Sequence, residues 1–238
     1  MIKSIGLLAR RAALSHEDFV RHWAGIHVPM SSEVPGLRGY CISHITETLR
    51  HPHAPLIAMP REIDGIAETW AEDVEAQARM AASREAQTWF ADGAKFIGHI
   101  KSWRTEEIVI IPPVRGPAPI VKVVSLIARK PSYTHDAFLK HWIDVHGGMA
   151  RGVPGLRGFV LSRIIGEPTR PDVPTMTIDP PVDGIAEAWF DSAEARTAMA
   201  QTEEAQRWFA DGGLFIGQIT SYATTEQVVI PPPPFAPR

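Results

Sequence analysis

Apolar positions along the chain alternate between short runs of strand length and longer stretches with helical spacing. The run IKSIGLLA, residues 2–9, has the length and apolar character of a strand. In the following stretch, residues 15–30, large apolar side chains recur about every 3.6 positions, which predicts a helix with one buried face. Ser15 is the expected N-cap of this helix, because acidic residues follow it in the first turn.

The pattern continues to a complete β-α-β-β-α-β unit. Residues 40–46 and 65–71 have strand character, and a long proline- and histidine-bearing connection, residues 49–63, separates them. Residues 72–98 have helical spacing, and residues 99–111 close the unit as a last strand. This order is that of the ferredoxin-like split motif.

The second half of the chain repeats the first without a gap. A shift of 119 residues aligns PGLRG at 35–39 with PGLRG at 154–158, and DGIAE at 64–68 with DGIAE at 183–187. About 49 of the 119 aligned positions are identical. The predicted domains are a first repeat at 1–111, a proline-rich linker at 112–119, a second repeat at 120–230 and a proline-rich tail at 231–238.

The repeat predicts how the two units associate. A single unit of this kind has helices on one face of its sheet only, so its other face needs a partner. A tandem copy supplies that partner within the chain. We therefore expect an α+β fold in which two ferredoxin-like repeats pack their sheets into one intrachain dimeric α+β barrel, either as a monomer or as part of a homodimer.

Composition restricts the classes of function. The formal net charge of the 238 residues is −3 and no basic run is present, which argues against a nucleic-acid partner. Cys41 is the only cysteine, so no disulfide within the chain and no cysteine-based zinc site is expected. No apolar stretch approaches the roughly 18 residues of a membrane span, and a cytoplasmic location is the default expectation. Nucleotide-binding and serine-triad motifs are also missing.

The residues FVRHWAGIHVPMSSEVPGLRGY, followed by DGIAETW and EAQTWFADGAKFIG, resemble the EthD-like family of dimeric α+β barrel proteins. The resemblance covers nearly all of each repeat. Relatives in this family and its wider superfamily include a methylmuconolactone isomerase, polyketide dehydratases, cofactor-free anthrone-type monooxygenases and haem enzymes. The resemblance implies a pocket in each half, with His27 or His146 facing into it and Tyr40 beside it; the second half has Phe159 in place of the tyrosine.

The residues themselves support His27 as a proton-transfer group. It lies four positions after Trp23, so both side chains share a helix face, and Trp142 and His146 have the same spacing. Pro29 in one repeat and a glycine pair in the other predict that the helix breaks just beyond the histidine and presents it to a pocket. An imidazole exchanges protons near neutral pH, although a half-buried structural histidine would show the same pattern.

Strand residues supply further candidates. Tyr40, Ile42 and His44 alternate and should share one strand face, with Arg163 at the position equivalent to His44. These polar groups suit binding of a substrate oxygen or anion, but solvent-facing strand ends would explain them equally well. Glu68 and Glu187 are predicted either to bind substrate or to pair with Arg38 and Arg157. The tryptophans expected to line the pockets are Trp23, Trp142, Trp70 and Trp189.

The remaining histidines are expected to play lesser roles. His22 and His141 should lie about 140° around the helix from the pocket histidines and therefore face solvent. His51 and His53 are a weak metal pair, so no metal site is predicted, although they could cover the pocket of the first half.

These patterns favour a cofactor-independent isomerase, dehydratase or other lyase that uses histidine acid–base chemistry on a small aromatic or lactone-like metabolite. His27, His146, Tyr40 and His44 would be its catalytic residues. The alternatives are a binding or accessory protein for an apolar metabolite, and a haem-dependent or cofactor-free monooxygenase.

Overall fold

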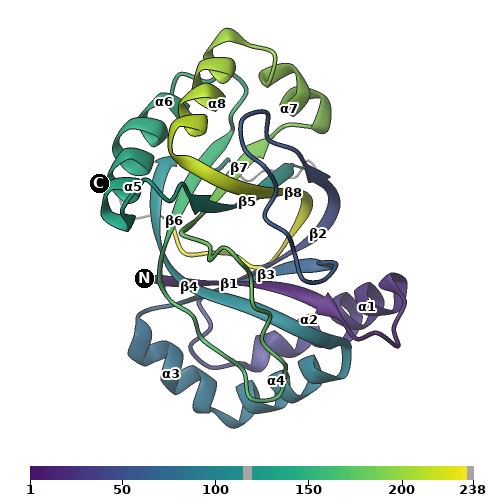
Figure 1. Ribbon diagram of the computed structural model, residues 1–238. Helices are drawn as coiled ribbons and strands as arrows, with labels where there is room; N and C mark the ends of the chain where they lie inside the picture. The colour runs from purple at the N-terminus through teal and green to yellow at the C-terminus, as the bar shows by residue number, and fades with distance from the viewer. Residues whose placement is uncertain (115–119, 235–238) are drawn as a thin grey trace.

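The computed structural model describes residues 1–114 and 120–234 and shows two repeats that share one barrel (Figure 1). Each repeat contributes four strands, and helices cover the outer face of the barrel at two opposite ends. The expected linker and tail fall partly on residues 115–119 and 235–238, which lie outside the described residues, so the predicted domain boundaries remain predictions.

The elements of the first repeat are β1 (Ile2–Arg10), α1 (His16–His22), the π-helix η1 (Trp23–His27), α2 (Val28–Met30), the 3-10 helix η2 (Ser31–Glu33), β2 (Gly39–Leu49), β3 (Gly65–Ala71), α3 (Val74–Ala82), α4 (Arg84–Phe96) and β4 (Ile97–Ile111).

The second repeat follows the same order. Three of its helices begin with side-chain caps, as in the first repeat: Thr134, Ser192 and Thr202 each accept a hydrogen bond from a first-turn amide. Its elements are β5 (Val121–Arg129), α5 (His135–Lys140), the π-helix η3 (His141–His146), α6 (Gly147–Ala150), β6 (Gly158–Gly166), β7 (Gly184–Phe190), α7 (Ala193–Met199), α8 (Glu203–Phe215) and β8 (Ile216–Ile230).

The eight strands form a closed antiparallel barrel in the order β1-β3-β2-β8-β5-β7-β6-β4. The repeats meet at two seams, where β2 pairs with β8 and β4 pairs with β6. Closure leaves the barrel without an unpaired edge strand, which removes a site for aggregation. The predicted fold class and the predicted intrachain pairing of the two sheets are therefore confirmed.

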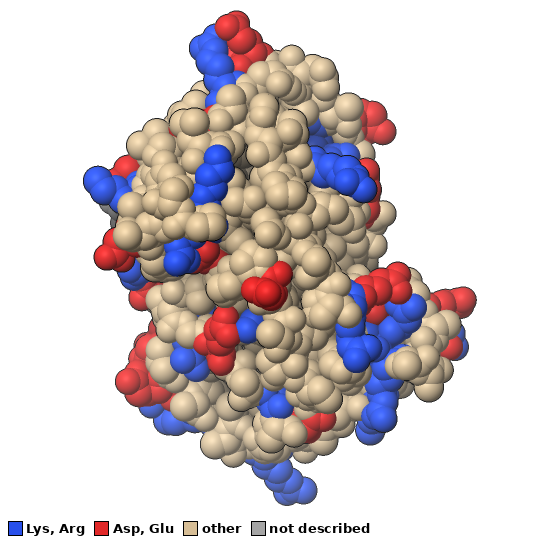
Figure 2. Space-filling model, in the orientation of Figure 1, with Lys and Arg blue, Asp and Glu red and all other residues tan. Residues whose placement is uncertain are grey.

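Both faces of the sheet are buried, because one lines the barrel interior and the other lies under the helices. Ile5 and Leu7 of β1 belong to an apolar cluster inside the barrel, whereas Leu8 packs with the helices of the first repeat. The alternation predicted for β2 is present, since Tyr40 and Ile42 pack on the helix side. On the face shown in Figure 2, basic and acidic side chains are interspersed. Among the described helices, none is both long and apolar enough to cross a membrane.

Candidate active site in two roofed pockets

Each repeat has a cavity between the helix side of its sheet and its own helices. The first cavity has a volume of about 400 Å³ and the second about 420 Å³, within the size range of small-molecule sites. The walls use equivalent residues: Trp23, His27, Tyr40, Trp89 and Ile100 in the first cavity, and Trp142, His146, Phe159, Trp208 and Ile219 in the second.

The roof of each cavity comes from the other repeat. Residues 168–172, in the connection after β6, cover the first cavity, and residues 49–52, at the end of β2, cover the second. Figure 1 shows this exchange, with the dark-blue connection rising along the second repeat and the green connection descending to α4. His51 therefore lies over the pocket of the second half, and the expectation that it could cover the first is wrong. The exchange follows from the barrel, in which β2 pairs with β8 and β6 with β4.

The helix that carries the pocket histidine widens instead of breaking. The amide of Val28 donates to the carbonyl of Trp23, five residues earlier, and the amide of Gly147 donates to Trp142 in the same way. These bonds define a π-helical turn, and the helical backbone continues through Pro29 into α2. The predicted break after His27 is therefore wrong. Both repeats form the π-turn, although only one has a proline there.

The π-turn places two histidines of the first repeat on one carboxylate of α4. The Nδ1 atom of His27 lies 3.1 Å from Asp92 Oδ2, and Nε2 of His22 lies 3.2 Å from the same carboxylate. A π-turn has more residues per turn than an α-helix, so His22 and His27 lie closer together in angle than the ideal α-helical spacing predicts. The prediction that His22 and His141 face solvent is wrong, because His141 Nε2 lies 3.0 Å from Asp211.

Burial keeps the imidazole of His27 neutral. Burial lowers the pKa of His27 to about 4, although the hydrogen bond to Asp92 opposes this shift. Burial alone would raise the pKa of Asp92, but bonds from Lys95, His22 and His27 lower it, so its carboxylate is ionised and accepts the Nδ1–H of His27. The other nitrogen, Nε2, is then the basic atom of the ring. The ring is stacked on Trp89 at 5.0 Å, which fixes its orientation.

The second pocket has the same histidine–aspartate pair. His146 Nδ1 lies 2.8 Å from Asp211 Oδ2, the ring is stacked on Trp208 at 5.0 Å, and burial lowers the pKa of His146. Its Nε2 is therefore also the basic atom.

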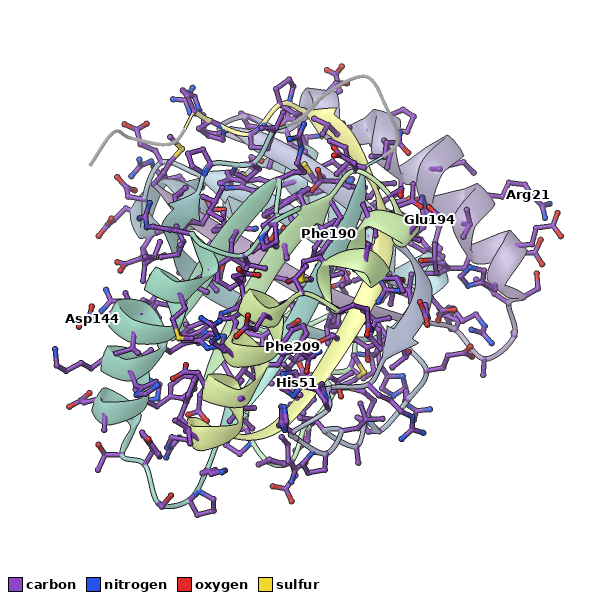
Figure 3. The ribbon with its side chains drawn as sticks, turned by 90° about the horizontal axis from the view of Figure 1, so that it is seen from above. Arg21, His51, Asp144, Phe190, Glu194 and Phe209 are labelled. Atoms are coloured by element: carbon purple, nitrogen blue, oxygen red, sulfur yellow. The ribbon has the colours of Figure 1, made fainter. Side chains whose placement is uncertain are left out.

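A second imidazole reaches this pocket from the roof. The Nδ1 atom of His51 accepts the backbone amide of His53 at 3.2 Å, so the proton of the neutral ring is on Nε2. Burial lowers the pKa of His51 to about 4. His51 lies beside Phe209 (Figure 3), and their ring centroids are 5.6 Å apart. A Cβ atom on Gly212 would lie within 3.8 Å of Cε1 of both His51 and His146. One neutral imidazole thus offers a lone pair here and the other offers a proton.

Arg170 occupies the equivalent roof position over the first pocket. Its guanidinium lies 4.8 Å above the Phe90 ring, and its Nη2 donates to the Phe90 carbonyl at 2.5 Å. A Cβ atom on Gly93 would lie 3.0 Å from Arg170 Nη1 and 3.3 Å from His27 Cε1. The first pocket therefore combines a basic imidazole with a permanent cation.

The structure brings some predicted pocket residues together and separates others. Tyr40 lines the first cavity, where its hydroxyl accepts the Trp23 indole N–H at 3.1 Å and burial raises the pKa of the phenol. His44 meets the edge of the Trp23 ring at 5.4 Å and lies outside the cavity lining. Arg163 is exposed on the barrel wall and pairs with Glu106 of β4, so its predicted role in substrate binding is wrong.

Glu68 and Glu187 lie inside the barrel and not in the pockets. Lys3 Nζ is 2.6 Å from Glu68 and 2.5 Å from Glu187, and Lys122 pairs with both carboxylates. The predicted partners Arg38 and Arg157 instead bind Glu72 and Asp191 at the surface. Trp70 and Trp189 also face the barrel interior, where the two lysines lie 4.9 and 5.0 Å from their ring centroids. Their assignment to the pockets is therefore wrong as well.

Sequence reasoning missed Asp92, Asp211 and the roof position 51/170. The aspartates stand in the FADG segment that both repeats share, but Asp92 of helix α4 lies 65 residues from His27 in the chain. The shared segment was an available signal for these carboxylates. No pattern in the sequence indicates that each pocket is covered by a segment of the other repeat.

Comparison with known proteins shows a matching family and a curated relative. The EthD domain model matches residues 11–100 and 130–219. The 4-carboxymethyl-4-methylbutenolide mutase of Pseudomonas reinekei is 31% identical over 109 residues, which are 46% of this chain and the whole of the mutase.

Solved structures show the same fold at low identity. An anthrone oxidase-like protein aligns with a TM-score of 0.62 and 12% identity, over 96% of this chain and 93% of its own. A proposed monooxygenase from Lactobacillus acidophilus aligns with a TM-score of 0.58 and 12% identity, over 95% and 94% of the two chains. Both match nearly the whole two-repeat barrel.

Proposed function

The chain belongs to the EthD domain family, and from this premise we propose that it is a cofactor-independent isomerase of a small lactone-like or aromatic metabolite. The mutase of Pseudomonas reinekei, which resembles one repeat over its full length, supports a rearrangement of this kind. A related lyase reaction, such as loss of water, would use the same proton-transfer groups.

The observation that carries the proposal is the pair of complementary imidazoles in the second pocket. Asp211 accepts the Nδ1 proton of His146 and leaves its Nε2 as a base, whereas the His53 amide leaves His51 with a proton on Nε2. An isomerisation needs one group that removes a proton and another that supplies one. Both imidazoles are neutral at pH 7, so neither has to lose a charge first.

The proposed reaction balances within the pocket. His146 Nε2 takes a proton from a carbon next to the substrate carbonyl, so a C–H bond breaks and the electron pair moves into an enolate. His51 Nε2–H then gives its proton to another atom of the enolate, and the product has the same composition as the substrate. His146 is then an imidazolium and His51 an imidazolate, and the transfer of one proton from His146 to His51 through solvent restores both neutral rings. Trp142, Phe159 and Trp208 would hold the apolar part of the substrate.

The first pocket offers a related but not identical set of groups. His27 is the corresponding base and Tyr40 contributes a hydroxyl, but Arg170 replaces the imidazole acid. A guanidinium does not release its proton at physiological pH and would instead stabilise negative charge. Both His27 and His146 remain proposed bases, with the complete acid–base pair in the second pocket.

The test is conversion of 4-carboxymethyl-4-methylbutenolide and its methyl ester in D₂O without added cofactor, followed by NMR and mass spectrometry. We expect an isomer that carries solvent deuterium. His146→Ala and His51→Ala should each reduce turnover by about 10²–10⁴ if the second pocket carries the reaction. His53→Ala is the matched control, because it removes an exposed imidazole from the same roof and keeps the amide that binds His51.

Two results would contradict the proposal. Full turnover in the double variant His27→Ala/His146→Ala, with an unchanged circular dichroism spectrum, would show that neither imidazole is the base. Recovery of both compounds without deuterium, although they bind, would instead favour a protein that holds such metabolites without converting them.

A further inference from the structure

The floors of the two pockets differ although their walls are equivalent. In the first pocket the sheet presents Ser4, Thr69 and Arg104 to the cavity. The positions 119 residues later are Val123, Ala188 and Ala223, and the first two line the second cavity. The first floor is therefore cationic, whereas the polar side chains on the second floor are the uncharged Ser125 and Ser221.

Arg104 is held in place by neutral groups. Its Nε donates to Gln77 Oε1 at 2.6 Å, and Gln77 Nε2 donates to Ser4 Oγ at 2.6 Å. Among residues 1–114 and 120–234, no carboxylate lies within ion-pair distance of Arg104. The hydrogen bonds from Arg104 to Gln77 and from Gln77 to Ser4 orient the guanidinium but leave its charge without a carboxylate partner. This arrangement favours the binding of an anionic ligand.

Arg170 adds a second guanidinium at the roof of the same cavity. The Phe90 ring, the Phe90 carbonyl and the carboxylate of Asp172 fix it there. Its Nη1 is directed towards Gly93, beside His27. The first pocket thus presents arginine donors from both floor and roof, each already oriented by neighbouring groups.

In the second pocket, the charge of the arginine that lines the cavity is neutralised by a glutamate of the protein. Arg196, at the position equivalent to Gln77, lines that cavity, but its Nη2 pairs with Glu47 of the first repeat at 3.1 Å. The roof there contributes the neutral His51 and, at its exposed edge, Arg50. The second pocket also has Ala223 in place of Arg104, so an anionic ligand there finds no cation among the described residues of the sheet floor.

We propose that the first pocket is a binding site for aromatic carboxylates, with Arg104 as the anion anchor and Arg170 as the second contact, and that the two pockets of the chain differ in ligand charge. A planar guanidinium binds a carboxylate through two parallel hydrogen bonds. Trp23, Trp89 and Ile100 provide the apolar wall for the ring. This concerns binding alone and is independent of the proton transfer assigned to His146 and His51.

The test is isothermal titration of the full chain with 2-naphthoate and with its methyl ester, which differ in charge but hardly in shape. Arg104→Met should weaken 2-naphthoate binding at least tenfold and change binding of the ester less than twofold. Arg170→His, which installs the residue found over the other pocket, should also weaken naphthoate binding. Arg163→Met is the matched control, because it removes an exposed arginine from the barrel wall, and it should leave binding unchanged.

The same titrations can overturn the proposal. Unchanged naphthoate affinity in both Arg104→Met and Arg170→His would do so, and so would absence of naphthoate binding to the wild-type chain. If Arg196→Met weakened naphthoate binding as much as Arg104→Met, the carboxylate would not be selective for the first pocket. Arg104→Lys, which keeps the charge but loses the paired donors, should retain part of the affinity even if Arg104→Met folds poorly. Loss of turnover in His146→Ala with unchanged naphthoate binding would separate this proposal from the catalytic one.

Discussion

At the scale of single residues, the state of the His27 ring depends on two opposing effects. Burial favours the neutral form, and the ionised Asp92 favours the protonated form, with burial the stronger of the two. Asp92 therefore selects which nitrogen carries the proton, but it does not charge the ring. The same residue pair in the second repeat shows that this balance is built into both pockets.

The balance makes stability depend on pH. His27 has a pKa of about 4 in the folded chain and 6.5 as the ordinary value, so at pH 5 the unfolded chain is protonated here and the folded chain is not. The stabilisation is therefore complete above pH 6.5 and is lost as the pH falls towards 4. Between pH 7 and pH 5 the free energy of unfolding should fall by about 2 kcal/mol more in the wild type than in His27→Asn. Urea unfolding at both pH values measures this difference, and parallel pH dependence in the two proteins would contradict it.

At the scale of elements, the π-turn of η1 and its contact with β3 determine the positions of Trp23 and His27 in the pocket wall. Trp23 and His27 are buried within the turn, while a Cβ atom added to Gly25, on its outer side, would meet no neighbouring atom within 4 Å. Gly65 of β3 lies directly under Trp23, where a Cβ atom would be 2.2 Å from the indole. These two glycines therefore have opposite structural roles.

Substitution of the two glycines should consequently have opposite effects. Gly25→Ala should raise the free energy of unfolding by about 0.5–1 kcal/mol, because it reduces the freedom of the unfolded chain and meets no obstacle in the helix. Gly65→Ala should lower it by about 1–3 kcal/mol, because the indole must move. Urea unfolding of both variants tests the pair. A stabilising Gly65→Ala would show that Trp23 can shift freely.

The spacing of side chains around each strand and helix also explains which site residues could be predicted from the sequence. The alternation of β2 correctly placed Tyr40, and the repeat correctly predicted the barrel. Strand alternation cannot tell the pocket side from the barrel interior when both are buried, so Glu68 was misassigned. An ideal α-helical phase misplaced His22 because a π-turn has one more residue between bonded groups. The repeated FADG segment marks Asp92, but its contact with His27 and the position of His51 over the second pocket are tertiary contacts that no local pattern encodes.

At the scale of the whole molecule, an ionic cluster joins the repeats inside the barrel. Lys3 and Glu68 come from the first repeat, Lys122 and Glu187 from the second, and each lysine contacts both carboxylates. Burial alone would raise the pKa of Glu187, but Lys122 and Lys3 lower it well below its usual range. Each lysine thus pairs with a carboxylate of the other repeat as well as with one of its own, and these ion pairs link the two halves.

Removal of one charge from this cluster should be costly. Glu187→Gln should lower the free energy of unfolding by about 3–5 kcal/mol, because it leaves buried lysine charge with less compensation. Adding Lys3→Met to this variant should restore part of the loss, because it removes one of the two buried lysines that Glu187 neutralises. Denaturant unfolding of the single and double variants measures the coupling, and strictly additive losses would contradict it.

The exchanged roofs bear on how such a molecule can diverge. In an assembly of two identical subunits, a substitution in the connector after the second strand would appear over both pockets at once. Joining the two copies in one chain makes positions 51 and 170 separately heritable, so a histidine persists over one pocket while an arginine covers the other. A substitution in the roof segment of one repeat therefore changes the pocket of the other repeat and leaves its own pocket roof unaltered.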